Sequence, residues 1–191
     1  MKNIDMISYL DVYNRINSKT SDSVGKIKLL IENEDISASD ELYNFLKDIE
    51  DIFRRNQISE FTDIAGYRVK LLASRTALDQ RIPQKKYQLE TALALIPTIT
   101  QTVNNAMKPI ECKINKSRNI IKELVSQAYD SNMIQYHKGT NFSDFIHALW
   151  RLLLNHDNFK KQAKLVSKYI STDDILLILS EEVHQENISM K

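Results

Sequence analysis

The 191-residue chain is predicted to be all-α, a helical bundle of about 7–9 helices with a long central kinked helix or a coiled-coil-like hairpin. Only three glycines and three prolines occur, which is too few for the tight turns that a sheet needs. Apolar residues recur at helical spacing along most of the chain. With 42% hydrophobic and 27% charged residues, the composition is that of a folded protein, and no window approaches the ~20 apolar residues of a membrane helix.

Residues 1–60 are predicted to form a region of three short amphipathic helices. The first carries apolar residues from Ile4 to Ile16, the second follows a cap at Ser21, and the third follows a cap at Ser39. Each of these helices has one apolar face to bury.

Residues 61–131 are predicted to form a long helical hairpin or arm. A first helix runs from Phe61 to about residue 80, and Pro83 suits the first turn of the next helix. From there apolar residues recur every seven residues, and the phase passes unshifted through Pro97 and Pro109. This favours one long kinked helix over residues 85–129; the alternative ends a helix near residues 104–108 and folds back.

The heptad pattern predicts an apolar seam that needs a partner helix. That helix could come from another protein or from a second copy of this chain. The residues expected to bind the partner are Leu89, Ile96, Ile99, Val103, Ile110 and Leu124.

Residues 141–186 are predicted to form a C-terminal bundle of short helices; the alternative is one continuous domain with the rest. The sequence STDD at residues 171–174 is typical of a helix N-terminus. The adjacent carboxylates Asp173 and Asp174, like Glu181 and Glu182, are expected to lie in solvent.

Charge is unevenly distributed, since residues 61–131 have 11 Lys/Arg against 6 Asp/Glu and residues 1–60 have 8 against 12. The basic excess is concentrated around the turn at Pro83, where Arg75, Arg81, Lys85 and Lys86 could bind phosphates or an acidic partner surface. The alternative is that these cations complement the acidic N-terminal helices.

Arg151 and His156 are separated by four residues in RLLLNH. This spacing resembles the signature of the HEPN ribonucleases, although Leu152 stands where that family usually has a polar residue. The resemblance implies a helical dimer in which His156 exchanges a proton with a ribose hydroxyl and Arg151 binds the phosphate. The alternative is structural, with His156 at a helix C-terminus and Arg151 on a solvent face.

Other catalytic classes find no support in the sequence. Glycine-rich phosphate loops and HExxH spacings are missing, and Cys112 is the only cysteine, so no cofactor, metal site or small-molecule ligand is predicted. The first residues lack a signal-peptide pattern, which favours the cytoplasm. We therefore expect a non-enzymatic helical interaction or adaptor subunit of a larger bacterial or phage assembly, with a nucleic-acid-binding accessory subunit or a HEPN-like ribonuclease as alternatives.

Overall fold

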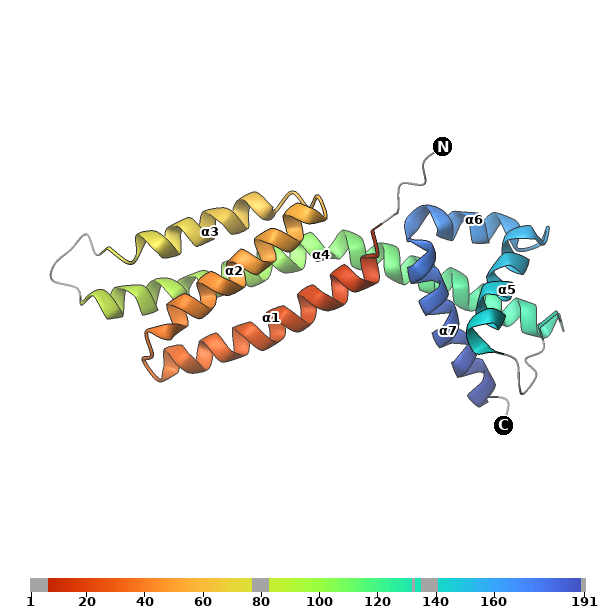
Figure 1. Ribbon diagram of the computed structural model, residues 1–191, viewed down its shortest axis with the longest axis horizontal. Helices are drawn as coiled ribbons and strands as arrows, with labels where there is room; N and C mark the ends of the chain where they lie inside the picture. Colours follow the sequence, from red (N-terminus) through yellow and green to blue (C-terminus); the bar gives the residue numbers. More distant parts are fainter. Residues whose placement is uncertain (1–6, 77–82, 132, 135–140, 190–191) are drawn as a thin grey trace. The chain divides into compact units, whose positions relative to one another are not determined.

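A computed structural model of the chain describes residues 7–76, 83–131, 133–134 and 141–189, and within these residues it contains seven helices and no strand. The predicted all-helical class is confirmed. In this described part no helix is both long enough and apolar enough to cross a membrane. In chain order the helices are α1 (Tyr9–Glu32), α2 (Ser37–Arg55), α3 (Phe61–Ala73), α4 (Gln84–Asp130), α5 (Phe142–Asn155), α6 (Lys160–Tyr169) and α7 (Thr172–Ser189), as drawn in Figure 1.

The chain divides into two compact units, and α4 contributes to both. One, which we call the four-helix unit, comprises residues 11–109. The other, which we call the C-terminal unit, comprises residues 1–10 and 110–191. This division differs from the three consecutive regions expected, because a single helix supplies buried residues to both units.

Helix α4 runs without interruption from Gln84 to Asp130 through two internal prolines. The prediction of one long helix is confirmed, and the alternative in which the chain folds back near residues 104–108 is wrong. Pro97 and Pro109 are both exposed, so neither ring displaces a core side chain. Burial of the opposite, apolar face at about 1.5–3 kcal/mol per large side chain outweighs the roughly 3 kcal/mol that each proline costs.

Helix α1 is continuous, although the sequence predicted two helices separated at Ser21. The polar residues around Ser21 were expected to form a break. Ile16 and Ile27 are both fully buried, and their separation of eleven residues is close to three helical turns. One helix therefore places both side chains in the core.

Helix α2 begins at Ser37, earlier than the predicted cap at Ser39, which is buried inside the helix. The carboxylate of Asp35 accepts a hydrogen bond from the Ser37 backbone N–H at 2.9 Å. Asp35 therefore provides the cap that was assigned to Ser39. Helix α3 is also shorter than expected, since it ends at Ala73 and not near residue 80.

In the four-helix unit each helix contacts the next one along the chain, and α1 and α4 are neighbours as well, so the four helices form a bundle (Figure 1). Lys26 of α1 pairs with Glu41 of α2 at 2.8 Å, and the hydroxyls of Tyr67 of α3 and Thr102 of α4 are 3.0 Å apart. The core between the helices is apolar and includes Val12, Ile16, Ile27, Leu42, Phe45, Leu46, Ile49, Phe53, Ile64, Leu71, Ala92, Leu95, Ile99 and Val103.

In the C-terminal unit, helices α5, α6 and α7 pack against one another, close to the positions that the sequence predicted. Their apolar faces, together with that of the second half of α4, form the core. It includes Ile114, Ile121, Leu124, Val125, Leu149, Trp150, Leu153, Phe159, Ala163, Val166, Ile175, Ile178 and Leu179.

The carboxylate of Asp174 is only 2% exposed, which corrects the expectation that it lies in solvent. It accepts hydrogen bonds from the Ser8 hydroxyl at 2.6 Å and from the backbone N–H groups of Tyr9 at 2.9 Å and Leu10 at 3.3 Å. The N–H of Asp174 donates to the Ser171 hydroxyl at 3.2 Å, so the predicted cap at STDD is confirmed. One carboxylate thus lies at the positive N-terminal ends of both α1 and α7.

Glu182 is also buried, at 4% exposure, although it too was expected in solvent. Arg118 of α4 lies 2.7 Å from a carboxylate oxygen of Glu181 and 3.4 Å from one of Glu182. The pairing with a cation from another helix is what makes a carboxylate tolerable at this depth.

Candidate functional site

The apolar seam on α4, which was expected to bind a partner, is covered by the chain itself. Leu95 and Met107, which lie outside the seam, are buried as well, so the buried face is wider than a coiled-coil seam. In this packing the seam offers little exposed apolar surface, and binding of a partner along it stays a prediction. The residues concerned, all 8% exposed or less, are Leu89, Ile96, Ile99, Val103, Ile110 and Leu124.

An open groove remains between α1 and α4 in the four-helix unit. It consists of two hollows that share Leu93. The first has a volume of about 490 Å³ and lies between the C-terminal end of α1 and the N-terminal end of α4. Its lining is half apolar and half charged and comprises Ile31, Glu34, Pro83, Lys85, Lys86, Leu89, Glu90 and Leu93.

The second hollow continues along the same two helices and has a volume of about 570 Å³. Along α4 the two hollows extend from Lys85 to Lys108, about 35 Å at 1.5 Å per residue. The lining of the second hollow comprises Lys28, Leu93, Ile96, Pro97, Thr100, Gln101, Asn104, Asn105 and Lys108.

Leu93 is the main apolar contact that the groove offers to solvent, since it is 52% exposed. Leu89 and Ile96 also line the groove but are almost completely buried. Leu89 and Ile96 therefore form part of the floor of the groove, while the other four seam residues lie in the core or in the C-terminal unit.

The two prolines of α4 alter hydrogen bonding along this groove. Proline has no N–H, so Pro97 and Pro109 cannot donate the helical bond to the carbonyl oxygens of Leu93 and Asn105. Leu93, Pro97 and Asn105 all line the groove. The carbonyl oxygens of Leu93 and Asn105 therefore lack the helical N–H donor that a residue other than proline would supply.

Charges differ between the two hollows. In the first, Lys86 lies 3.8 Å from Glu90. In the second, the lining contains Lys28 and Lys108 and no carboxylate. Lys108 donates to the side-chain oxygen of Asn105 at 3.1 Å. This half of the groove therefore carries positive charge without an acidic counterpart in its lining.

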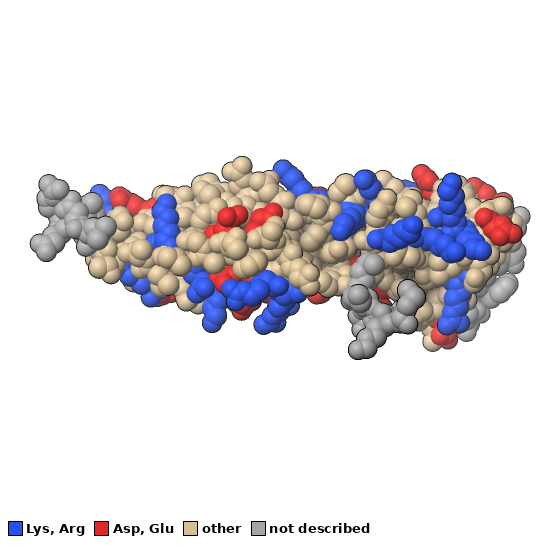
Figure 2. Space-filling model, turned by 90° about the horizontal axis from the view of Figure 1, so that it is seen from above, with Lys and Arg blue, Asp and Glu red and all other residues tan. Residues whose placement is uncertain are grey.

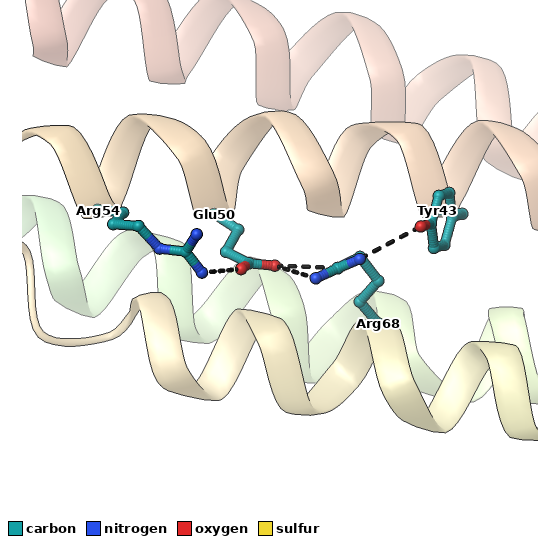
Figure 3. A network of polar contacts seen from close by, with 4 residues as sticks. All are labelled: Tyr43, Glu50, Arg54 and Arg68. Carbon is teal, nitrogen blue, oxygen red and sulfur yellow. Dashed lines mark hydrogen bonds and ion pairs between the residues drawn. The ribbon is translucent and has the colours of Figure 1, made fainter.

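Glu50 of α2 is a buried carboxylate that pairs with two arginines, Arg54 of α2 and Arg68 of α3. In Figure 3, Arg68 donates to Glu50 at 2.9 Å and to the Tyr43 hydroxyl at 3.2 Å, while Arg54 donates to the other oxygen of Glu50 at 2.5 Å. The hydrogen bond to Tyr43, followed by that to Glu50, raises the pKa of Arg68 above its ordinary value. Glu50 is 4% exposed, so this is a buried carboxylate held by two cations.

Of the four residues predicted to bind phosphates, the three that the structure describes each lie near a carboxylate. Arg75 pairs with Asp40 at 2.6 Å and lies over the Tyr43 ring, 5.7 Å from its centroid. Lys86 pairs with Glu90, and Arg81 lies outside the described residues.

Lys85 lies near Asp35, whose pKa is lowered first by the hydrogen bonds from Ser37 and to a smaller extent by this lysine. Acidic and basic side chains are interspersed over the four-helix unit on the face seen in Figure 2. This arrangement favours the alternative in which the cations complement acidic helices.

Within the described residues, no hydrogen bond joins Arg151 and His156. Arg151 is exposed on α5, and His156 is the residue that ends this helix. The Nδ1 atom of His156 accepts the Asn158 N–H at 3.3 Å, and its ring centroid is 5.0 Å from that of Phe159. These positions agree with the structural alternative; a ribonuclease role stays a prediction.

Sequence reasoning missed Leu93 and the lysines of α6. Leu93 falls outside the heptad seam, and an apolar residue at such a position is the signal that could have pointed to it. The run KKQAK at residues 160–164, followed by Lys168, concentrates charge in a short helix. It was overlooked because residues 132–191 balance 7 Lys/Arg with 7 Asp/Glu.

Among the described residues, no group of three or more His, Cys, Asp or Glu side chains is placed to hold a metal ion. Comparisons of the chain with protein families, with curated proteins and with solved structures found no match.

Proposed function

We propose that the chain is a non-enzymatic interaction subunit that binds one amphipathic helix of a protein partner in the α1–α4 groove. The observation that carries the proposal is the 52% exposure of Leu93 at the junction of two adjoining hollows. An exposed apolar side chain within an elongated hollow is typical of sites that receive the apolar face of a helix.

The dimensions of the groove suit a helix. A length of about 35 Å accommodates roughly six helical turns, so apolar residues at positions i, i+3, i+4 and i+7 of a partner could contact Leu93 and its neighbours. Polar donors at the edge of the partner helix could bond to the carbonyl oxygens of Leu93 and Asn105, which lack their helical donors.

Charge complementarity specifies the partner further. Lys28 and Lys108 line the second hollow without a carboxylate, so a partner with Asp or Glu residues at that end gains favourable contacts. A basic helix would be disfavoured there. The proposed occupant is therefore an amphipathic helix with carboxylates beside its apolar face.

A photo-crosslinking amino acid at position 93 tests the proposal in the cells that make the protein. Position 177 is a matched control, because Leu177 is 50% exposed but lies on α7, away from the groove. We expect a partner protein to crosslink at 93 and not at 177. The crosslinked segment, identified by mass spectrometry and synthesised, should have an apolar stripe with neighbouring carboxylates.

Binding of this synthetic segment is then measured by fluorescence anisotropy. Leu93→Lys removes about 1 kcal/mol of apolar burial and adds an unfavourable charge contact, so affinity should fall at least about fivefold, while Leu177→Lys should leave it unchanged. Affinity independent of position 93 contradicts the proposal. Crosslinking to a second copy of this chain contradicts it too, because the groove would then be a self-interface.

A further inference from the structure

We infer that α6 binds the phosphate backbone of a double-stranded nucleic acid through Lys160, Lys161, Lys164 and Lys168. All four lysines are exposed on a helix of 10 residues. Within the described part of the chain none of their ammonium groups forms a hydrogen bond or an ion pair. This site lies in the C-terminal unit and is independent of the groove proposed above.

The lysine arrangement is unfavourable for the folded chain alone. Lys160 and Lys164, and Lys164 and Lys168, are spaced i,i+4, where like charges repel. The first turn of α6 contains no acidic residue but begins with Lys160 and Lys161, at the positive end of the helix dipole. An anionic ligand would remove both penalties.

The spacing of these charges matches a regular polyanion. Lys160, Lys164 and Lys168 form a row about 12 Å long at 1.5 Å per residue. One strand of a duplex advances about 3.4 Å per phosphate, so three to four phosphates fall within this length. Figure 2 shows Lys and Arg side chains gathered over the part of the molecule where α6 lies.

Other anionic ligands fit this surface less well. The apolar face of α6 is buried through Ala163 and Val166, and Leu165, at 40% exposure, is the one large apolar side chain of this helix that is exposed, which is too little to insert into a membrane. Its one aromatic residue, Tyr169, is half-buried, so α6 lacks the stacking platform that binds single strands. Lysines contact phosphates as point charges, and the binding should therefore be independent of base sequence.

Fluorescence anisotropy with the full chain and labelled 20-base-pair duplexes of DNA and of RNA tests this inference. If all four lysines contact phosphates, the slope of log K against log salt should approach about −3.6 on DNA. Affinity should then fall roughly hundredfold between 50 and 200 mM salt. Replacing all four lysines by glutamine should abolish binding at 50 mM salt, and Lys164→Gln alone should reduce the slope by about 0.9.

The matched control replaces Lys47, Lys70, Lys116 and Lys122 by glutamine, four exposed lysines outside α6. Its net charge equals that of the α6 variant, so affinity within about twofold of the unchanged protein supports a local site. A loss as large as in the α6 variant overturns it.

Competition distinguishes the ligand class. Binding to either duplex supports the inference, and the duplex that binds shows whether the phosphates belong to DNA or to RNA. Binding to neither duplex, or displacement by polyglutamate of equal charge as readily as by unlabelled duplex, overturns the inference. So does equal retention on vesicles of anionic lipid. A change of slope on Lys164→Gln cannot arise from general unfolding, which keeps the test decisive if the fourfold variant misfolds.

Discussion

Replacing Asp174 by alanine should destabilise the C-terminal unit by about 3 kcal/mol. The substitution removes a buried, charged acceptor from the N–H groups of Tyr9 and Leu10 and from the Ser8 hydroxyl. Hydrogen bonds to charged groups contribute about 1.5–3 kcal/mol each. We take a value below the sum, because Ser8 is half-buried and can bind water, and because the Leu10 bond is long at 3.3 Å.

Urea denaturation followed by tryptophan fluorescence measures this effect in the right part of the molecule. The chain has one tryptophan, Trp150, which is 5% exposed on α5 in the C-terminal unit. Ser8→Ala should lower the free energy of unfolding by about 1 kcal/mol in the unchanged protein and by a smaller amount when Asp174 is already alanine.

Asp173→Ala is the matched control for Asp174→Ala. Asp173 is adjacent and also lies in the first turn of α7, but it is exposed. Only its interaction with the helix dipole is lost, about 0.5 kcal/mol. Equal losses for the two aspartates, or full additivity of the Ser8 and Asp174 changes, would refute the assignment of Asp174 as the cap of α1.

Three further predictions concern the four-helix unit. Glu50→Gln should lower the free energy of unfolding of this unit by about 2 kcal/mol, because Glu50 is a buried charge between two arginines. Glu41→Gln, in an exposed ion pair of the same helix, should change the free energy of unfolding by less than about 0.5 kcal/mol. Urea denaturation followed by circular dichroism compares the two variants. Gly25→Ala should raise the free energy of unfolding by about 1 kcal/mol in a thermal melt, since its Cβ would meet no atom within 4 Å and alanine favours the helix; a lower melting temperature would contradict this. The hydrogen bond from Ser37 lowers the pKa of Asp35 below 3.8, so the stabilising contribution of the Asp35 carboxylate is present above that pH and is lost as the pH falls through the folded pKa. Acid titration should therefore destabilise the unchanged protein more than Asp35→Asn. Parallel curves of stability against pH for the two proteins would argue against this cap.

The long helix α4 could be predicted from the sequence because its signal is local. Apolar residues keep one phase on both sides of Pro97 and Pro109, and this regularity persists in the structure. The same regularity could not show which elements cover the apolar face. Partner choice depends on contacts between residues far apart in the chain, and these proved to come from the chain itself.

The misplaced charged residues have the same cause. Asp174 was assigned to solvent because carboxylates are rarely buried without partners, yet its partners lie at residues 8–10, more than 160 residues away. Ser21 shows the converse case, since a polar run that resembled a break continues as helix between buried Ile16 and Ile27. Propensity is local, whereas burial is decided by the tertiary packing.

The sharing of α4 between two units has a practical consequence for anyone who maps function by truncation. A fragment that stops after residue 109 would lack the partners of Ser8, Tyr9 and Leu10, and a fragment that starts at residue 110 would lack these three residues themselves. Truncation within α4 would thus disturb the packing of both units. Single substitutions on exposed positions, such as those on the groove and on α6, are the safer way to assign activities to regions.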